Sequence, residues 1–197
     1  ANLNRKIIHF VVGLAVSFSP FIFISNIQPL MLAGIFLIIN FFSYKRNKLK
    51  SFHNINRTTL GTIFFPLGFI IIASLFWEYK NSIACSFMIL AVSDPLSSFV
   101  GENVKKPRIY NIGEDLKSYE GTMIMFLSTF IILYLFSNSI FNQFDNLGSF
   151  LAIMLCSFAI TISEAMSIKG SDNISIPMIA FFFIEIFNVV KKQNFIF

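Results

Sequence analysis

Four carboxylates stand at or beside the ends of long apolar segments: Asp94, Glu120, Glu164 and Asp172. A charge in such a position is costly unless it is paired, and carboxylates gathered in one place repel each other unless a cation lies among them. Oxygen ligands without sulfur suit Mg²⁺, which commonly binds one or two protein carboxylates together with substrate phosphates. We therefore expect Asp94 and Glu164 to bind a divalent cation, and Asp94 and Glu120 to be catalytic.

Basic residues near the same segment ends could bind phosphate oxygens: Arg5, Lys6, Arg57 and Lys117. Carboxylates, Mg²⁺ and basic side chains together suit phosphoryl transfer, because positioning and charge neutralisation dominate that reaction. A carboxylate could also accept the proton of an attacking hydroxyl group. The sequence has no Walker A glycine loop and no His-Arg-Asp or Asp-Phe-Gly kinase motif, so a nucleotide would have to be bound in another way.

The elements that position these residues are membrane helices. The chain of 197 residues is 55% hydrophobic and 13% charged, whereas a soluble domain carries about twice that charged fraction. The apolar segments are longer than the roughly 10-residue strands of a membrane barrel. We expect a single-domain, all-α integral membrane protein, a bundle of about seven transmembrane helices. The expected spans are Ile7–Ile24, Pro29–Phe42, Leu60–Phe76, Ser82–Val100, Thr122–Phe136, Leu147–Ile162 and Ile174–Val190.

The distribution of Lys and Arg predicts the orientation. Three basic residues fall on one side of the seven spans: Lys80, Lys191 and Lys192. The other twelve, all of the remaining Lys and Arg, fall at the N-terminus and in the loops after spans two, four and six. Positive charge marks cytoplasmic loops, so the N-terminus and the polar cluster are expected to face the cytoplasm, in a prokaryotic-type inner or plasma membrane. The net charge of +5 then reflects contact with anionic lipid, not nucleic acid. No cleavable signal peptide and no disulfide are expected.

Asp94 is the residue around which the other polar elements are expected to gather. It precedes Pro95, and this order is typical of a helix start, because Asp is a preferred N-cap and Pro is favoured in the first helical position. Spans four and six also carry polar stripes at helical spacing, which should face the bundle interior. These stripes are Ser86, Ser93 and Ser97 in one span and Ser157, Thr161 and Glu164 in the other. Glu185 lies toward the opposite end of the bundle.

Three motifs together resemble a known family. The first is Ser93-Asp94 followed by Gly101; the second is Lys117-Ser118-Tyr119-Glu120-Gly121-Thr122; the third is Glu164-Ala165 with Lys169-Gly170-Ser171-Asp172-Asn173 and Pro177. The opening Arg5-Lys6 with His9, and Arg57 followed by Gly61 and Phe65-Pro66-Leu67-Gly68, are also similar. The chain resembles, over nearly its whole length, the polyprenol kinase family, which includes dolichol kinase, phytol kinase and the CTP-dependent diacylglycerol kinase.

The resemblance implies transfer of the γ-phosphoryl group of CTP to an isoprenoid or other lipid alcohol, with a divalent cation. It implies that Asp94 belongs to the metal or nucleotide site. It also implies that the segment from Lys117 to Gly121 forms a CTP-binding loop, with Asp172 and Asn173 in a second polar loop. The sequence departs from the family twice, because Ser93 stands where the family has Gly and Glu102 where Arg is common.

Other interpretations of these residues remain open. Asp94 could be an ordinary helix cap, Lys117 and Glu120 a solvated pair, and His9 a packed or interfacial side chain. A phosphatidate cytidylyltransferase would use similar groups, but its paired-Asp signature is not found in the sequence. A transporter could use the carboxylates as a cation site, although no inverted repeat is evident.

Overall fold

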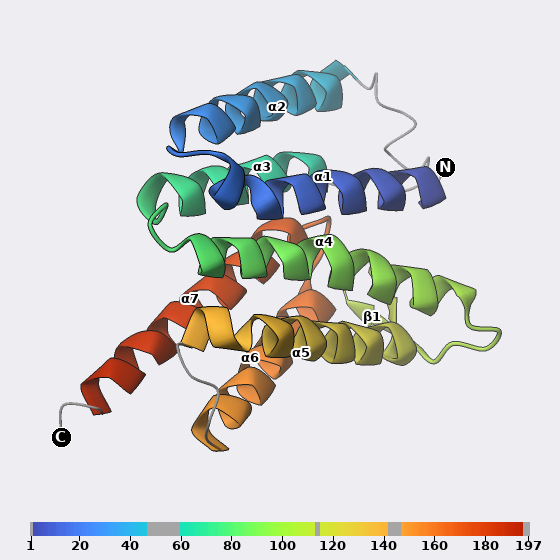
Figure 1. Cartoon of the computed structure of the whole chain (residues 1–197). Helices are drawn as coiled ribbons and strands as arrows, with labels where there is room; N and C mark the ends of the chain where they lie inside the picture. The colour runs from blue at the N-terminus through green and yellow to red at the C-terminus, as the bar shows by residue number, and fades with distance from the viewer. Residues whose placement is uncertain (1, 47–59, 113–114, 142–146, 195–197) are drawn as a thin grey trace.

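Seven helices and one short hairpin make up the computed structural model, which describes residues 2–46, 60–112, 115–141 and 147–194 (Figure 1). The elements in chain order are α1 (Asn2–Ile22), α2 (Ile27–Arg46), α3 (Gly61–Leu75), α4 (Lys80–Asn103), β1 (Ile109–Ile112), β2 (Asp115–Ser118), α5 (Tyr119–Phe141), α6 (Leu147–Met166) and α7 (Asp172–Asn194). Each of the seven expected spans corresponds to one of these helices.

The helices identify a membrane protein by their length and apolar composition. Within the described ranges, five are long and apolar enough to cross a membrane: Ile27–Lys45, Lys80–Asn103, Tyr119–Ile140, Leu147–Met166 and Asp172–Val190. The apolar parts of the other two are shorter, Lys6–Ile22 and Gly61–Leu75. The two cysteines, Cys85 and Cys156, are both free and buried, as expected.

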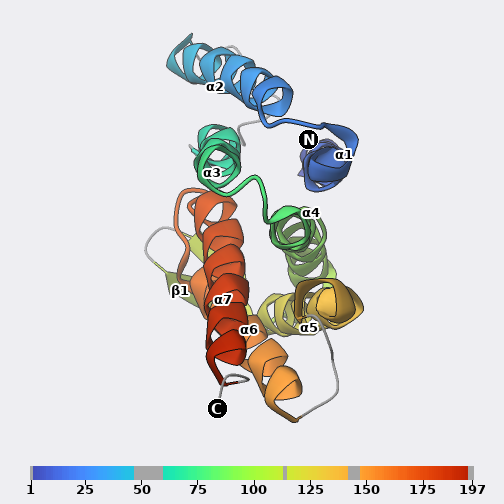
Figure 2. The same ribbon diagram turned by 60° about the vertical axis from the view of Figure 1, so that its left-hand side comes forward.

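Helix α4 is the centre of the bundle. It packs against α1 on one side, α5 on another and α7 on a third (Figures 1 and 2). Its approach to α1 is close at Gly13, where an added Cβ would lie 2.6 Å from the Cβ of Ala91. The core beside it includes Phe87 and Phe69, whose ring centroids are 5.4 Å apart. Helix α4 therefore places its polar residues among several partners.

The expectation that a helix begins at Asp94-Pro95 is wrong. Helix α4 runs unbroken from Lys80 to Asn103, with Pro95 inside it. Proline is tolerated inside a membrane helix where neighbouring groups satisfy the freed backbone carbonyl. Asp94 consequently projects from the side of a continuous helix instead of capping a new one. The polar stripes do face the interior as expected: Ser86, Ser93, Ser97, Ser157, Thr161 and Glu164 are all buried.

The all-α expectation also misses a hairpin. Strands β1 and β2 pair antiparallel between α4 and α5, with Ile109 opposite Ser118 and Ile112 opposite Asp115. Lys117, expected in a loop, therefore lies on a strand. The hairpin leads directly into α5, where the hydroxyl of Ser118 accepts a hydrogen bond from the backbone N–H of Gly121 at 3.1 Å and so caps the helix.

Candidate functional site

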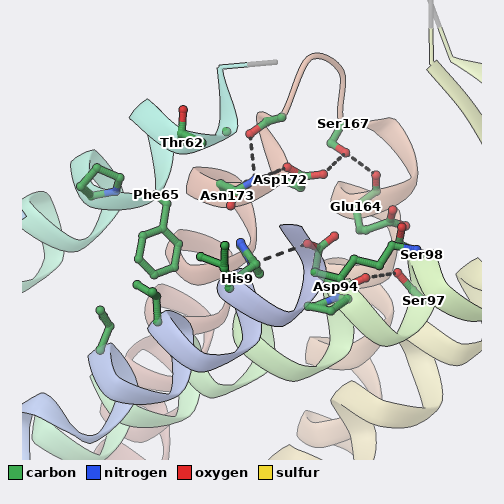
Figure 3. A pocket seen from close by; sticks show the side chains of 18 of the residues that line it. His9, Thr62, Phe65, Asp94, Ser97, Ser98, Glu164, Ser167, Asp172 and Asn173 are labelled. Carbon is green, nitrogen blue, oxygen red and sulfur yellow. Dashed lines mark hydrogen bonds and ion pairs between the residues drawn. The ribbon is translucent and has the colours of Figure 1, made fainter. Parts of the chain in front are cut away.

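A cavity of about 1150 Å³ brings together most of the polar residues that the sequence singled out. At its polar end, charged and hydroxyl side chains converge from α1, α4, α6 and the start of α7 (Figure 3). Lys117 of β2 also lines the cavity. The sequence-predicted residues that line it are Lys6, Asp94, Lys117, Gly121, Glu164, Asp172 and Asn173. Elements far apart in the chain therefore line one cavity.

Asp94 faces His9 across the interface of α4 and α1. The Nε2 of His9 lies 3.6 Å from Oδ2 of Asp94, and each side chain is 21% exposed (Figure 3). The His9 ring also meets Phe65 of α3 edge-on, with centroids 5.6 Å apart. His9 is thus oriented from two sides, and together with Asp94 it can take a proton from a bound hydroxyl group.

Lys117 and Glu164 form a largely buried ion pair between the hairpin and α6. The Nζ of Lys117 donates to Oε1 of Glu164 at 2.6 Å and to Oγ of Ser167 at 2.8 Å, and it also contacts the carbonyl oxygen of Glu164. The exposed fractions of the two side chains are 13% and 10%. Lys117 is therefore held by several acceptors at the cavity wall.

The turn between α6 and α7 brings a helix N-terminus to the same cavity. Lys169 and Gly170 have φ values of 52° and 86°, which reverse the chain before Asp172 opens α7. Oδ1 of Asp172 accepts hydrogen bonds from the backbone N–H of Asn173 at 2.9 Å and from its side-chain Nδ2 at 2.7 Å. Lys169, Gly170 and Asn173 all line the cavity. The positive end of a helix dipole favours anions such as phosphate.

Asp115 holds that turn in place, a role that the sequence did not reveal. Its Oδ2 accepts a hydrogen bond from the backbone N–H of Lys169 at 2.8 Å, and Asp115 is buried. The carbonyl oxygen of Lys169 accepts from the backbone N–H of Leu60 at 2.8 Å. A left-handed φ is uncommon for a lysine, and such conformations concentrate at functional sites. Lys169, a non-glycine residue, was the available sequence signal of this turn, but the sequence does not reveal that its φ is positive.

Glu102, one of the two departures from the family pattern, pairs with Lys6. The Nζ of Lys6 donates to Oε2 of Glu102 at 2.6 Å, and it lies 5.8 Å from the centroid of the Phe99 ring. The other carboxylate oxygen of Glu102 accepts from Ser98 at 3.2 Å. Lys6, assigned to nucleotide binding, is therefore joined to α4 by a carboxylate at the rim of the cavity.

Glu120 does not line the cavity. Its carboxylate accepts hydrogen bonds from the backbone N–H of Arg108 at 3.1 and 3.2 Å, which ties the start of α5 to the start of the hairpin. Gly121 does line it, and an added Cβ there would lie 2.8 Å from the carbonyl oxygen of Ser97. Arg57 and the side chain of Arg5 lie outside the described part of the structure. Glu185 contacts Ser82 at the opposite end of α4, away from the site as expected.

The carboxylates at the polar end are of the chemical type that a hard cation prefers. Asp94, Glu164 and Asp172 line the cavity, and their oxygen atoms are the ligands that Mg²⁺ prefers. Among the described residues no group of three His, Cys, Asp or Glu side chains is close enough to enclose a metal by itself. Two carboxylates completed by substrate phosphates would suffice for Mg²⁺. Glu164 would then be shared between the cation and Lys117.

Comparison with known proteins supports a distant relationship to phytol kinase. The chain is 26% identical to the phytol kinase of Synechocystis sp. over 188 residues, covering 90% of this chain and 76% of that protein. It is 28% identical to the uncharacterized protein MJ1137 of Methanocaldococcus jannaschii, covering 99% of each. It is 32% identical to the uncharacterized protein RP860 of Rickettsia prowazekii over 60% of this chain and 53% of that protein. No family model and no solved structure matches. The phytol kinase match suggests a kinase-type lipid function.

Proposed function

We propose that this protein is a kinase that transfers the γ-phosphoryl group of CTP to the hydroxyl group of a lipid alcohol at the cytoplasmic face of the membrane. The observation that carries the proposal is the composition of the cavity. One end holds carboxylates, lysines and the start of α7, and the remainder is lined mostly by apolar side chains of α1, α2 and α3. A phosphate donor and a lipid acceptor need these two environments in contact with each other.

The polar end would bind the triphosphate. Lys117 and Lys169 supply positive charge, and the start of α7 supplies the positive end of the helix dipole. Mg²⁺ bound to Asp94 and Glu164 would neutralise charge on the phosphate oxygens. Lys6 and Arg5 remain part of the proposed nucleotide site, with Lys6 oriented by Glu102.

His9 and Asp94 would act on the acceptor. The acceptor oxygen attacks the γ-phosphorus, the bond from that phosphorus to the bridging oxygen breaks, and CDP leaves. The hydroxyl proton passes to the His9–Asp94 pair, whose atoms lie 3.6 Å apart. A positioned acid–base group contributes about 10²–10⁴-fold to such a step. Glu120 would act through the hairpin as a positioning residue, because its carboxylate is engaged by Arg108.

A product assay tests the proposal against its rival. The protein in lipid nanodiscs is incubated with Mg²⁺, a panel of lipid alcohols, phosphatidate, and CTP labelled on either the α- or the γ-phosphate. If the lipid acquires label from γ-labelled CTP and CDP is released, the result supports a kinase. Label from α-CTP with release of pyrophosphate would instead identify a cytidylyltransferase. ATP in place of CTP tests the choice of nucleotide.

A further inference from the structure

We propose that the acceptor is an alcohol with a single hydrocarbon chain, which enters sideways from the bilayer between α1 and α2 and lies in an apolar groove beside the polar site. This inference rests on the proposed function and specifies its acceptor. The groove is the apolar continuation of the cavity already described. Its walls include Val11 and Ala15 of α1, Ala33 and Phe36 of α2, and Phe65 of α3.

The packing of the first three helices produces the groove. Helix α1 packs on α4 and helix α2 packs on α3, whereas α1 and α2 barely contact each other within the described ranges. Figure 2 shows α1 and α3 as separate helices, with α2 lying outside both. Side-chain hydrogen bonds hold α2 and the turn before it to α3: Asn40 to the carbonyl of Thr62 at 2.8 Å, and Asn26 to the carbonyl of Ala73 at 3.1 Å. The side of α2 that faces α1 therefore stays open.

The opening faces lipid. Most of α2 is exposed, with 6% of its apolar window buried inside the structure. Such a surface is stable in hydrocarbon, so the space between α1 and α2 connects the groove to the acyl chains of the bilayer. An acceptor already dissolved in the membrane can reach the site without crossing water.

The dimensions of the groove favour an acceptor with one hydrocarbon chain of moderate length. The lining residues of α1 run from Lys6 to Ile22, a rise of about 24 Å at about 1.5 Å per residue. The hydrocarbon core of a bilayer is about 30 Å thick, so an extended chain in the groove would stay within it. The cavity of about 1150 Å³ must also hold the triphosphate, so we infer that it accommodates one chain beside the nucleotide.

The orientation of the acceptor follows from the position at which the groove changes from polar to apolar. His9 and Phe65 touch at the boundary between its polar and apolar parts. A chain lying along α1 would bring its hydroxyl group to His9 and Asp94, while its far end reaches Ile22 and Pro29. The chain length that fits is then determined by the distance from His9 to that end.

Crosslinking tests the groove without requiring catalysis. The full protein in nanodiscs is exposed to a geranylgeraniol analogue with a photoreactive diazirine at its far end, in the absence of nucleotide. We expect labelled peptides from the end of α1 and the start of α2, near Ile22 and Pro29, and loss of label when unmodified geranylgeraniol competes. Labelling confined to the outer faces of α5 and α6, without competition, would overturn the inference.

A matched pair of substitutions tests specificity. Ala33→Phe adds an aromatic ring inside the groove, whereas Ile35→Phe adds one on the same helix at a position that does not line the cavity and is 52% exposed. The acceptors are prenyl alcohols of two, three and four isoprene units, and diacylglycerol. We expect Ala33→Phe to lower the ratio of four-unit to two-unit activity at least about tenfold, and Ile35→Phe to leave it unchanged.

The outcomes separate this inference from the proposed function. If the wild type phosphorylates alcohols but Ala33→Phe leaves the ratio unchanged, the groove assignment is wrong and the kinase assignment stands. The groove assignment is equally wrong if Ala33→Phe and Ala15→Phe both reduce activity toward all acceptors by the same factor, or if the wild type prefers diacylglycerol. If no alcohol is phosphorylated while the crosslink forms and is competed, the kinase assignment fails and the lipid groove stands.

Discussion

The Nε2 of His9 lies 3.6 Å from Oδ2 of Asp94, and this contact joins α1 to α4 where the polar and apolar parts of the cavity meet. A carboxylate beside an imidazole orients the ring and stabilises the imidazolium that forms when it takes a proton. The pair is therefore placed to take part in the proton transfer that we propose.

Substitution of His9 should affect the chemical step. We expect His9→Gln to lower kcat about 10²-fold or more, because the amide cannot accept the hydroxyl proton. KM for CTP should change little, since the proposed phosphate contacts come from other residues. Steady-state kinetics in nanodiscs provide the measurement, and Glu185→Gln is the control, because Glu185 contacts Ser82 far from the cavity. Unchanged kcat in His9→Gln would remove His9 from the mechanism.

Two ion pairs of equal length should differ in their contribution to stability. Lys117–Glu164 and Lys6–Glu102 are both 2.6 Å, but Glu164 is 10% exposed and Glu102 47% exposed. Breaking a buried pair leaves an uncompensated charge and costs about 3–5 kcal/mol, whereas an exposed pair contributes about 0–1 kcal/mol.

We therefore expect Lys117→Met to lower the Tm in detergent far more than Lys6→Met. The double variant Lys117→Met with Glu164→Gln should recover part of the loss, because no unpaired carboxylate is left. Equal Tm values for Lys117→Met and Lys6→Met would contradict the burial argument.

The turn before α7 allows the lysine side chain to be separated from its backbone. Lys169 has a φ of 52°, so Lys169→Gly preserves the backbone conformation while removing the charge. We expect normal thermal stability and a raised KM for CTP. Gly170→Ala, at a φ of 86°, should instead lower stability by about 1–2 kcal/mol. A KM for CTP unchanged in Lys169→Gly would exclude a role for this side chain in phosphate binding.

Substitutions of Glu120 distinguish positioning from catalysis. Its carboxylate accepts from the backbone N–H of Arg108, and a glutamine oxygen can accept the same hydrogen bond. We expect Glu120→Gln to retain most activity, and Glu120→Ala to lose activity and about 1 kcal/mol of stability. A catalytic carboxylate, which the motif alone predicts, would make both variants equally inactive with unchanged Tm values.

The sequence predicted the helices better than the local geometry. Long apolar runs between charged segments were enough to find seven helices, and several of the polar residues at their ends line one cavity in the structure. The pair Asp94-Pro95 led to the wrong prediction of a helix start, because this order is typical of a helix cap. In the structure, packing inside the bundle keeps α4 continuous through Pro95. Interactions that depend on tertiary contacts, such as Asp115 with Lys169, have no local signature.

The hairpin shows the same limit. Residues 109–118 are too short and too mixed in character to indicate strands, although β1 and β2 pair antiparallel in the structure. From the sequence, the motif around Lys117 and Glu120 was therefore interpreted as one binding loop. In the structure its two charged side chains point to different partners, Glu164 and Arg108.

The measurement that tests the central claim most directly is transfer of label from γ-labelled CTP to a lipid alcohol by the wild type and by Asp94→Asn. The asparagine is nearly isosteric but lacks the charge to bind Mg²⁺ or to stabilise protonated His9. We predict phosphorylated alcohol and CDP from the wild type, and at least about a 10²-fold loss in Asp94→Asn at an unchanged Tm. Equal transfer by both proteins would contradict the account.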